Sequence, residues 1–277
     1  MSDRFSNFHT HTCLCDGKDT PEELVLRALE LGCPALGFSG HSYAPYDEGY
    51  CMSVAQTAEY KAEIRRLQQK YAGRICIYMG IEQDFYSPSS TEGYDYVIGS
   101  VHYLYKNGAY LPVDASEAQQ AQAVQDYYGG DWYAFAEDYY RTVAQVRERI
   151  GCRIVGHFDL VTKFNEGDTL FSTRHPRYIR AVRQALDALA QADVTFEINT
   201  GAMARGYRSE PYPAREIMEE LRRRGVKRIL SSDCHSRENL LYGFSEYRDW
   251  IKCPDSPKRK QHFGRFSAFG GKILRYL

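Results

Sequence analysis

The sequence lacks a long hydrophobic run, a secretory signal and an excess of charge of one sign. No segment approaches the roughly 18 consecutive apolar residues that a membrane span needs. The N-terminal stretch Met1 to Asn7 has no basic region followed by an apolar one, so it does not resemble a signal peptide. The chain of 277 residues carries 35 basic and 36 acidic side chains, which nearly cancel. Nucleic-acid scaffolds and polybasic membrane binders need surplus Lys and Arg, so the composition argues against both kinds of partner.

Closely spaced cysteine pairs of the CxxC kind are also absent. The 8 cysteines are scattered along a long chain. This pattern favours reduced thiols and a cytoplasmic location over a disulfide-stapled secreted protein. Cys13, Cys15 and Cys234 lie near candidate ligand positions, but free cysteines are commonly small buried side chains. We therefore favour packing over metal ligation for these thiols.

Short apolar runs alternate with longer amphipathic stretches, which is typical of α/β proteins with parallel strands. Strands are predicted at 8–11, 35–39, 75–81, 96–101, 153–156, 194–198 and 228–231, and helices at 21–31, 55–71, 132–150, 176–190, 213–224 and 239–251. No Gly-rich phosphate loop follows any strand, which favours a closed barrel over an open doubly wound sheet. We interpret residues 1–277 as one domain. The polar stretch 106–131 is predicted to be a loop or helical insertion and is a candidate lid beside the site.

The histidines concentrate where strands are expected to end. Of the 8 histidines, those at or shortly beyond such an end are His9, His11, His41, His102, His157 and His235. In a parallel barrel these ends share one rim, and the active site is built there. His9 and His11 would face the same side of their strand, because residues i and i+2 do so. The pattern predicts that these imidazoles converge.

Three carboxylates accompany the histidines: Asp16 after the HxH pair, Glu82 after strand 75–81, and Asp233 two residues before His235. Six imidazoles and three carboxylates exceed what one tetrahedral zinc ion needs. The set predicts two to three divalent ions, Zn, Mn or Fe by ligand type, sharing a bridging carboxylate. Glycines precede four of these positions, which we interpret as backbone passing close to coordinated groups. They are Gly40, Gly80, Gly99 and Gly156.

The ordered motifs resemble those of the polymerase and histidinol phosphatase (PHP) superfamily. The resemblance covers most of the chain and rests on the HxH pair, Asp16, His41, Glu82, His102, His157 and the Asp-x-His of residues 233–235. It implies a distorted (β/α)7 TIM-like barrel of PHP type with a trinuclear site. By position, one ion would be held by His9, His11, Glu82 and Asp233, the second by Glu82, His102 and His157, and the third by Asp16, His41 and His235.

Segments 156–160 and 197–213 resemble the stand-alone histidinol-phosphatases of histidine biosynthesis. This likeness implies a phosphoric monoester hydrolase that converts L-histidinol phosphate and water to L-histidinol and phosphate, by attack of a metal-bridging hydroxide on phosphorus. Glu82, Asp233 and His235 would be the catalytic residues, with Asp233 and His235 as candidates to assist the leaving group. Arg205 would bind the phosphate.

Three other functions stay open, and the sequence indicates no oligomeric state. A PHP phosphoesterase acting on a nucleotide or sugar phosphate would share every ligand. An amidohydrolase-type enzyme also begins with HxH, but it often bridges its metals with a modified Lys, where this chain has Glu82 and His102. A non-catalytic metal-binding module tends to lose ligands, and this chain keeps the whole set.

Overall fold

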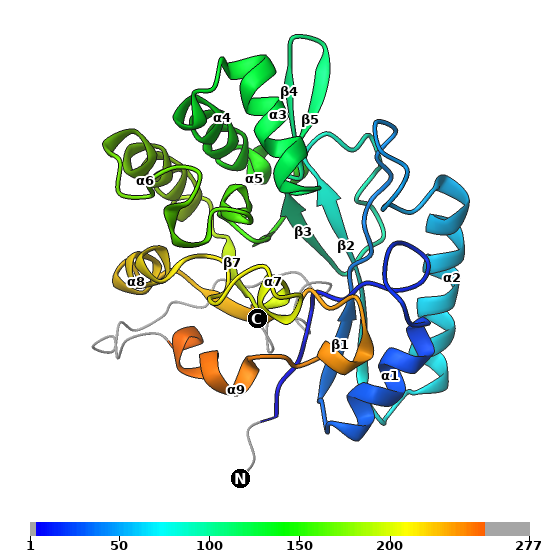
Figure 1. Ribbon diagram of the computed structural model, residues 1–277. Coiled ribbons are helices and arrows are strands. Elements are labelled where there is room, and N and C mark those ends of the chain that lie inside the picture. Colours follow the sequence, from blue (N-terminus) through cyan, green and yellow to red (C-terminus); the bar gives the residue numbers. More distant parts are fainter. Residues whose placement is uncertain (1–3, 253–277) are drawn as a thin grey trace.

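The computed structural model of the chain describes residues 4–252. Its main feature is a curled sheet of six parallel strands with helices on the outside (Figure 1). The strand order is β1 (Ala35–Phe38), β2 (Cys76–Asp84), β3 (Tyr96–Ser100), β6 (Ile154–Val155), β7 (Thr195–Asn199) and β8 (Arg228–Ser231). Because every neighbouring pair of these strands is parallel, the carboxyl ends of all six lie on one rim. Within the described residues, no helix is long and apolar enough to cross a membrane.

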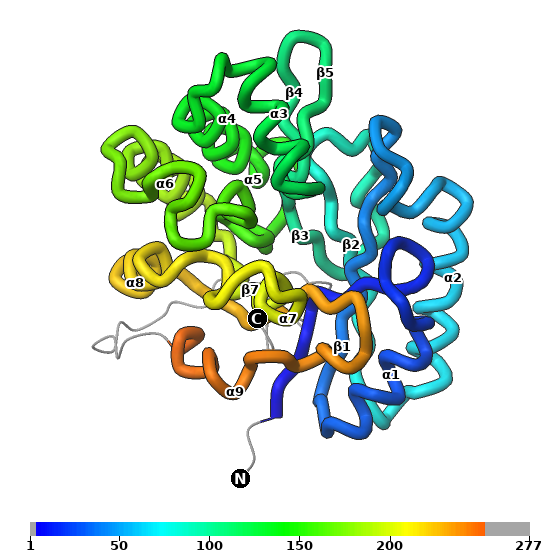
Figure 2. The backbone as a smooth tube through the Cα atoms, in the orientation of Figure 1, coloured from blue at the N-terminus to red at the C-terminus, as the bar shows by residue number. Residues whose placement is uncertain are grey.

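The N-terminal segment lies between the first and last strands of this sheet. Asn7 forms a parallel bridge with Leu36 of β1, and Thr10 forms another with Cys234, just beyond β8. Figure 2 shows this segment, in dark blue, beside β1 and crossed by the orange segment that follows β8. The strand predicted at 8–11 is therefore present as isolated bridges and not as a regular strand. The bridges still bring His9 and His11 to the rim.

Four helices agree with prediction to within two residues: α1 (Pro21–Glu30), α2 (Val54–Lys70), α6 (Pro176–Ala190) and α8 (Arg215–Arg223). Thr20 and Ser53 begin α1 and α2 with capping boxes, which satisfy amide groups that the helix leaves unpaired. The helix predicted at 132–150 is divided into α4 (Trp132–Val143) and α5 (Val146–Ile150).

The continuous helix predicted at 239–251 is wrong. This segment contains η3 (Arg237–Asn239), α9 (Phe244–Tyr247) and η4 (Arg248–Ile251). Gly243 interrupts it with a φ of 74°, a left-handed conformation that ends a right-handed helix. The turn passes close to Thr200, because a Cβ on Gly243 would lie 3.0 Å from the Thr200 methyl carbon.

The stretch 106–131 was expected to be a loop or helix, but it begins within a hairpin. β4 (Tyr103–Lys106) and β5 (Ala109–Pro112) pair in antiparallel register and are followed by α3 (Glu117–Tyr128). Asn107 and Gly108 turn the hairpin with φ values of 51° and 85°. Asn-Gly is a common hairpin turn because both residues tolerate positive φ, so the sequence did contain this signal.

Core side chains pack against both faces of the curled sheet, and this explains two of the glycines before the candidate ligands. A Cβ on Gly80 would lie 2.2 Å from the Tyr96 ring, and one on Gly99 would lie 2.5 Å from the sulfur of Cys152. Tyr96 donates a hydrogen bond to the backbone oxygen of Phe8 at 2.6 Å. The prediction that these glycines make room for coordinated groups is wrong: they make room for core side chains below the rim.

Candidate metal centre

All nine candidate ligands lie together at the carboxyl rim of the sheet. They are His9, His11, Asp16, His41, Glu82, His102, His157, Asp233 and His235, and all of them except Asp16 and His235 are buried. Most lie in segments that follow a strand. Glu82 was expected just after its strand but lies within β2, which continues to Asp84. The convergence expected from the strand ends is therefore what the structure contains.

Glu82 lies at the centre of this cluster. Its carboxylate oxygens are within 2.9–3.5 Å of nitrogens of His157, His41, His9, His11 and His102. Burial alone would raise the pKa of Glu82, but His9, His41 and His102 outweigh it and hold the pKa well below its usual value. Glu82 is therefore an ionised carboxylate with both oxygens facing imidazoles, as a residue that bridges two cations requires.

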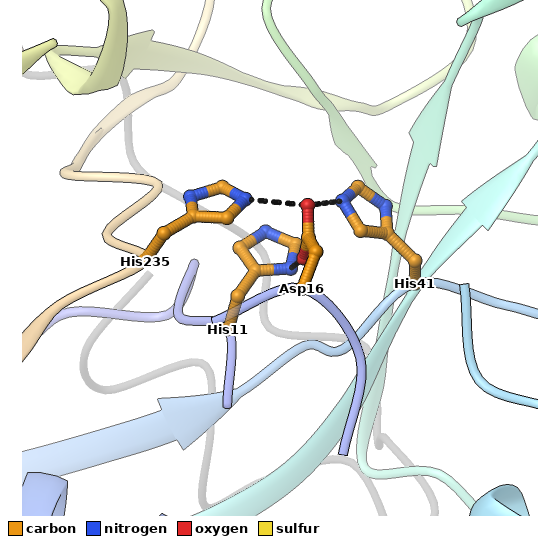
Figure 3. Close-up of side chains that lie close together, drawn as sticks. All are labelled: His11, Asp16, His41 and His235. Atoms are coloured by element: carbon orange, nitrogen blue, oxygen red, sulfur yellow. Dashed lines mark hydrogen bonds and ion pairs between the residues drawn. The ribbon is translucent and has the colours of Figure 1, made fainter. Parts of the chain in front are cut away.

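Asp16 holds a second part of the cluster together (Figure 3). Its oxygens lie 3.1 Å from His235 Nε2, 3.6 Å from His41 Nε2 and 3.7 Å from His11 Nδ1. Partial desolvation opposes ionisation of Asp16, but His41 and His235 outweigh it and hold the pKa far below its usual range. The four side chains offer ligand atoms that all lie within 4.8 Å of one another.

Asp233 supplies a third carboxylate between the first two histidines. Its Oδ1 lies 3.1 Å from His11 Nε2 and 3.5 Å from His9 Nε2. Burial would raise the pKa of Asp233, but His9, Arg205 and His11 hold it well below the usual value. The backbone of Asp233 has a φ of 45°, a left-handed conformation that Asp tolerates better than most residues.

The donor set fits divalent cations. Nε2 of His9, Nε2 of His11 and Oε2 of Glu82 are buried without a hydrogen-bond partner. Such unsatisfied atoms cost free energy unless a ligand satisfies them. Imidazole nitrogens and carboxylate oxygens suit Zn, Mn and Fe. The orphaned atoms face one another across the cluster, so a bound cation would satisfy all three.

The ligand groups differ in part from those implied by the PHP resemblance. His41 lies with Glu82 and His102 as well as with Asp16, and His11 lies with Asp16 as well as with Asp233. His157 lies as expected, with Nε2 2.9 Å from Glu82 Oε1 and its ring centroid 5.0 Å from that of His102. Because His11 and His41 each belong to two of the three ligand groups, the groups form one continuous centre.

Two buried carboxylates that sequence reasoning did not single out contact the ring nitrogens of His9 and His102 that face away from the cluster. Glu197 of β7 is completely buried, with one oxygen 2.5 Å from His9 Nδ1 and the other accepting a hydrogen bond from the His157 backbone N–H at 2.8 Å. Asp84 Oδ2 lies 3.2 Å from His102 Nδ1. A carboxylate at Nδ1 keeps the ring proton there and leaves Nε2 free for a metal. The available signal was an acid inside an apolar strand, as in Phe196-Glu197-Ile198.

Arg205 lies beside the cluster, and its side chain is 32% exposed. Nη1 donates to the Asp233 backbone oxygen at 2.9 Å and approaches His235 Nδ1 at 2.9 Å, while Nη2 lies 3.2 Å from Asp233 Oδ2. A cavity of about 310 Å³ opens over Arg205 and the cluster, and its wall also includes Asp114 and Lys163. The cavity suits a small ligand that contacts the guanidinium and the metal ligands together.

A rim of imidazoles and carboxylates under an open cavity, on a curled parallel sheet, defines a metal-dependent enzyme of α/β type. Residues 7–201 match the PHP domain, so the chain belongs to the PHP family, and the predicted membership is confirmed. A probable histidinol-phosphatase of Deinococcus radiodurans is 32% identical over 250 residues, which cover 86% of this chain and 89% of that protein. A probable histidinol-phosphatase of Schizosaccharomyces pombe is 28% identical over 252 residues, covering 84% and 80%.

Solved structures share this fold. The "putative histidinol phosphatase hisK" of Listeria monocytogenes superposes with a TM-score of 0.74 at 22% identity, covering 87% of this chain and 99% of that chain. The histidinol phosphate phosphatase of Lactococcus lactis subsp. lactis, complexed with zinc, L-histidinol and phosphate, gives 0.66 at 20% identity, covering 90% and 92%. These likenesses establish the PHP fold, in which the curled parallel sheet is the common element.

Proposed function

We propose that the protein is a metal-dependent phosphomonoester hydrolase whose substrate is L-histidinol phosphate, which it converts with water to L-histidinol and phosphate. The observation that carries the proposal is the gathering of nine candidate ligand side chains, with Glu82 at their centre, below an open cavity. The substrate assignment is supported by two relatives named probable histidinol-phosphatase, which match most of this chain.

We propose two to three divalent ions, Zn, Mn or Fe, as the cofactor. His9, His11 and Asp233 would hold one ion, and Asp16, His41 and His235 another, while His102 and His157 would complete the centre through Glu82. When bound, such ions would activate water and neutralise charge on the phosphoryl group. Zinc accompanies L-histidinol and phosphate in the Lactococcus lactis enzyme, which supports this choice of metals.

Arg205 would bind the phosphoryl oxygens of the substrate. Its guanidinium is partly exposed at the cavity and presents a planar set of donors that matches phosphate. Its present contacts with Asp233 and His235 would also hold those two side chains beside the substrate. Asp233 and His235 would then be candidates to assist departure of the leaving alcohol through a metal-held water.

We also propose that the sheet and the segment 7–10 together form a distorted (β/α)7 barrel within a single domain. The support is that Asn7 and Thr10 bridge the strands at the two ends of the sheet.

Residues 106–131 are proposed as a lid, since Asp114 and Ala115 line the cavity. A cytoplasmic location is supported by the cysteines, since no disulfide joins those within residues 4–252.

Phosphate release from L-histidinol phosphate by protein reconstituted with Zn, Mn or Fe tests the proposal. The panel should also contain nucleotides and sugar phosphates. We expect L-histidinol phosphate to give the highest kcat/KM, and chelation to abolish turnover reversibly. Preference for a nucleotide or sugar phosphate would replace the substrate assignment with another PHP phosphoesterase activity. Inactivity of fully metallated protein on every ester would contradict the reaction class.

A further inference from the structure

One side of the cavity is aromatic and acidic, in contrast to its imidazole-rich floor. It is formed where the loop after His41 meets the hairpin strand β4. The Tyr50 ring packs edge-on against His41, with centroids 4.8 Å apart, and the Tyr103 ring lies nearly parallel to Tyr50 at 6.4 Å. The Tyr103 hydroxyl donates a hydrogen bond to Asp47. Asp47, Tyr50 and Tyr103 all line the cavity, and we call these three residues the Asp47 wall.

Asp47 brings a negative charge to the cavity that no cationic side chain among residues 4–252 balances by an ion pair. Its oxygens accept hydrogen bonds from the Gly49 N–H and the Tyr103 hydroxyl, and no Lys, Arg or His in the described part of the chain forms an ion pair with it. Asp114, another acid of the cavity wall, differs because Lys163 Nζ lies 3.0 Å from its Oδ2. A carboxylate that faces a cavity with only neutral partners is complementary to a cationic ligand.

The rings of the Asp47 wall have the same preference. Aromatic faces attract cations, and an ammonium or imidazolium group can lie against them. The Tyr50 hydroxyl is buried and has no hydrogen-bond partner. Because an unpaired buried hydroxyl costs free energy, a ligand that donates an N–H to Tyr50 would recover it. The Asp47 charge, the two rings and the Tyr50 hydroxyl therefore all favour a cationic ligand that carries an N–H group.

We propose that the Asp47 wall binds the cationic part of the leaving group, so that the site selects phosphomonoesters whose alcohol carries an ammonium or imidazolium. This inference rests on the proposed function, in which the leaving alcohol is L-histidinol, a molecule with both an amino group and an imidazole. The phosphoryl end faces Arg205 and the metal ligands, and the cationic end faces Asp47. Asp47 is then a specificity-determining residue and takes no part in the chemical step.

Asp47→Asn tests the proposal, because it preserves side-chain size and removes the charge. Glu48→Gln is the matched control: it neutralises the next residue, whose carboxylate accepts from Tyr43 and does not line the cavity. Binding of L-histidinol to the zinc-loaded protein is measured by calorimetry, which needs no turnover. We expect Asp47→Asn to weaken binding about tenfold or more, the size of one lost hydrogen bond to a charged group. Glu48→Gln should leave it unchanged.

A second ligand, 3-(imidazol-4-yl)propan-1-ol, identifies which cation is bound because it lacks the amino group. If Asp47→Asn weakens L-histidinol more than this analogue, the ammonium faces Asp47; if it weakens both equally, the imidazolium does. Unchanged L-histidinol binding in Asp47→Asn overturns the proposal, and so does a wild-type protein that binds no L-histidinol. Should Asp47→Asn fail to fold, Tyr50→Phe removes only the unpartnered hydroxyl, and it must weaken L-histidinol binding for the proposal to stand.

Turnover separates this inference from the proposed function. Phenyl phosphate has no cation in its leaving group, so Asp47→Asn should keep its kcat/KM while losing kcat/KM for L-histidinol phosphate. Equal losses on both substrates would mean a structural role for Asp47 and would overturn the inference. Wild-type protein that hydrolyses phenyl phosphate but not L-histidinol phosphate contradicts the proposed function, and the calorimetry still decides the role of the Asp47 wall.

Discussion

The substitution Glu197→Gln tests whether the buried carboxylate that contacts His9 and His157 increases the affinity of the protein for metal. Glu197 Oε1 lies 2.5 Å from His9 Nδ1, and its Oε2 accepts hydrogen bonds from the His157 backbone N–H and the Asn199 side-chain amide. A glutamine has one oxygen and one NH2 group in place of the two acceptors. If its oxygen faces His157, its NH2 faces His9 Nδ1 and drives the ring proton to Nε2, the metal-facing atom. If the amide turns over, the His157 N–H loses its acceptor.

Either orientation weakens the metal centre without removing a direct ligand. Loss of such an outer carboxylate lowers metal affinity about 10–100-fold, equivalent to roughly 1.4–2.7 kcal/mol. Competition with a chromophoric zinc chelator measures this change, and thermal melting checks the fold. Asp168→Asn is the matched control. Asp168, the last residue of η2 (Glu166–Asp168), also accepts several hydrogen bonds, but its donors are Ser172 and Thr173 and none is a candidate ligand. Unchanged zinc affinity in folded Glu197→Gln would refute the reasoning.

Three further predictions concern the cluster itself. Glu82→Gln should lower metal content and activity together, since it neutralises the carboxylate that faces the imidazoles; full metal loading with retained activity would contradict its bridging place. Arg205→Ala should raise KM and weaken inhibition by inorganic phosphate with metal content intact, and Arg205→Lys should recover part of the loss; an unchanged KM would mean that another residue binds phosphate. Zinc binding near pH 7 should release protons and tighten as pH rises. Burial favours neutral imidazoles, but in metal-free protein the acids around His9 and His41 outweigh it and raise their pKa well above 6.5. Zinc must displace these protons. Calorimetry in buffers of different ionisation enthalpy measures the number of protons released on binding, and a value of zero would contradict the prediction.

The convergence of the ligands was predictable from sequence because it depends on a local property and one rule of topology. Each candidate lies near the carboxyl end of an apolar run, and parallel strands bring those ends to one rim. The strand boundaries matter little to this argument. β2 extends to Asp84, past Glu82, and the N-terminal strand is reduced to bridges at Asn7 and Thr10, yet the ligands still meet.

The residues that support the ligands were not predictable, because their roles depend on distant partners. Glu197 and His9 are separated by 188 positions in the chain, and only the folded arrangement of the curled sheet and the N-terminal segment brings them together. In the sequence Asp47 is one acid among others in a loop, and its contact with Tyr103 depends on the position of the β4–β5 hairpin in the fold. The helix predicted at 239–251 failed for a different reason: the prediction followed the amphipathic pattern and passed over Gly243, which takes a left-handed backbone conformation there.

Anomalous X-ray scattering from crystals of zinc-loaded protein tests most directly whether these side chains form one metal centre. We expect two or three peaks, all enclosed by the candidate ligands, with the Glu82 carboxylate between two of them. A lone peak away from Glu82, or zinc held by cysteine sulfurs instead, would contradict the account.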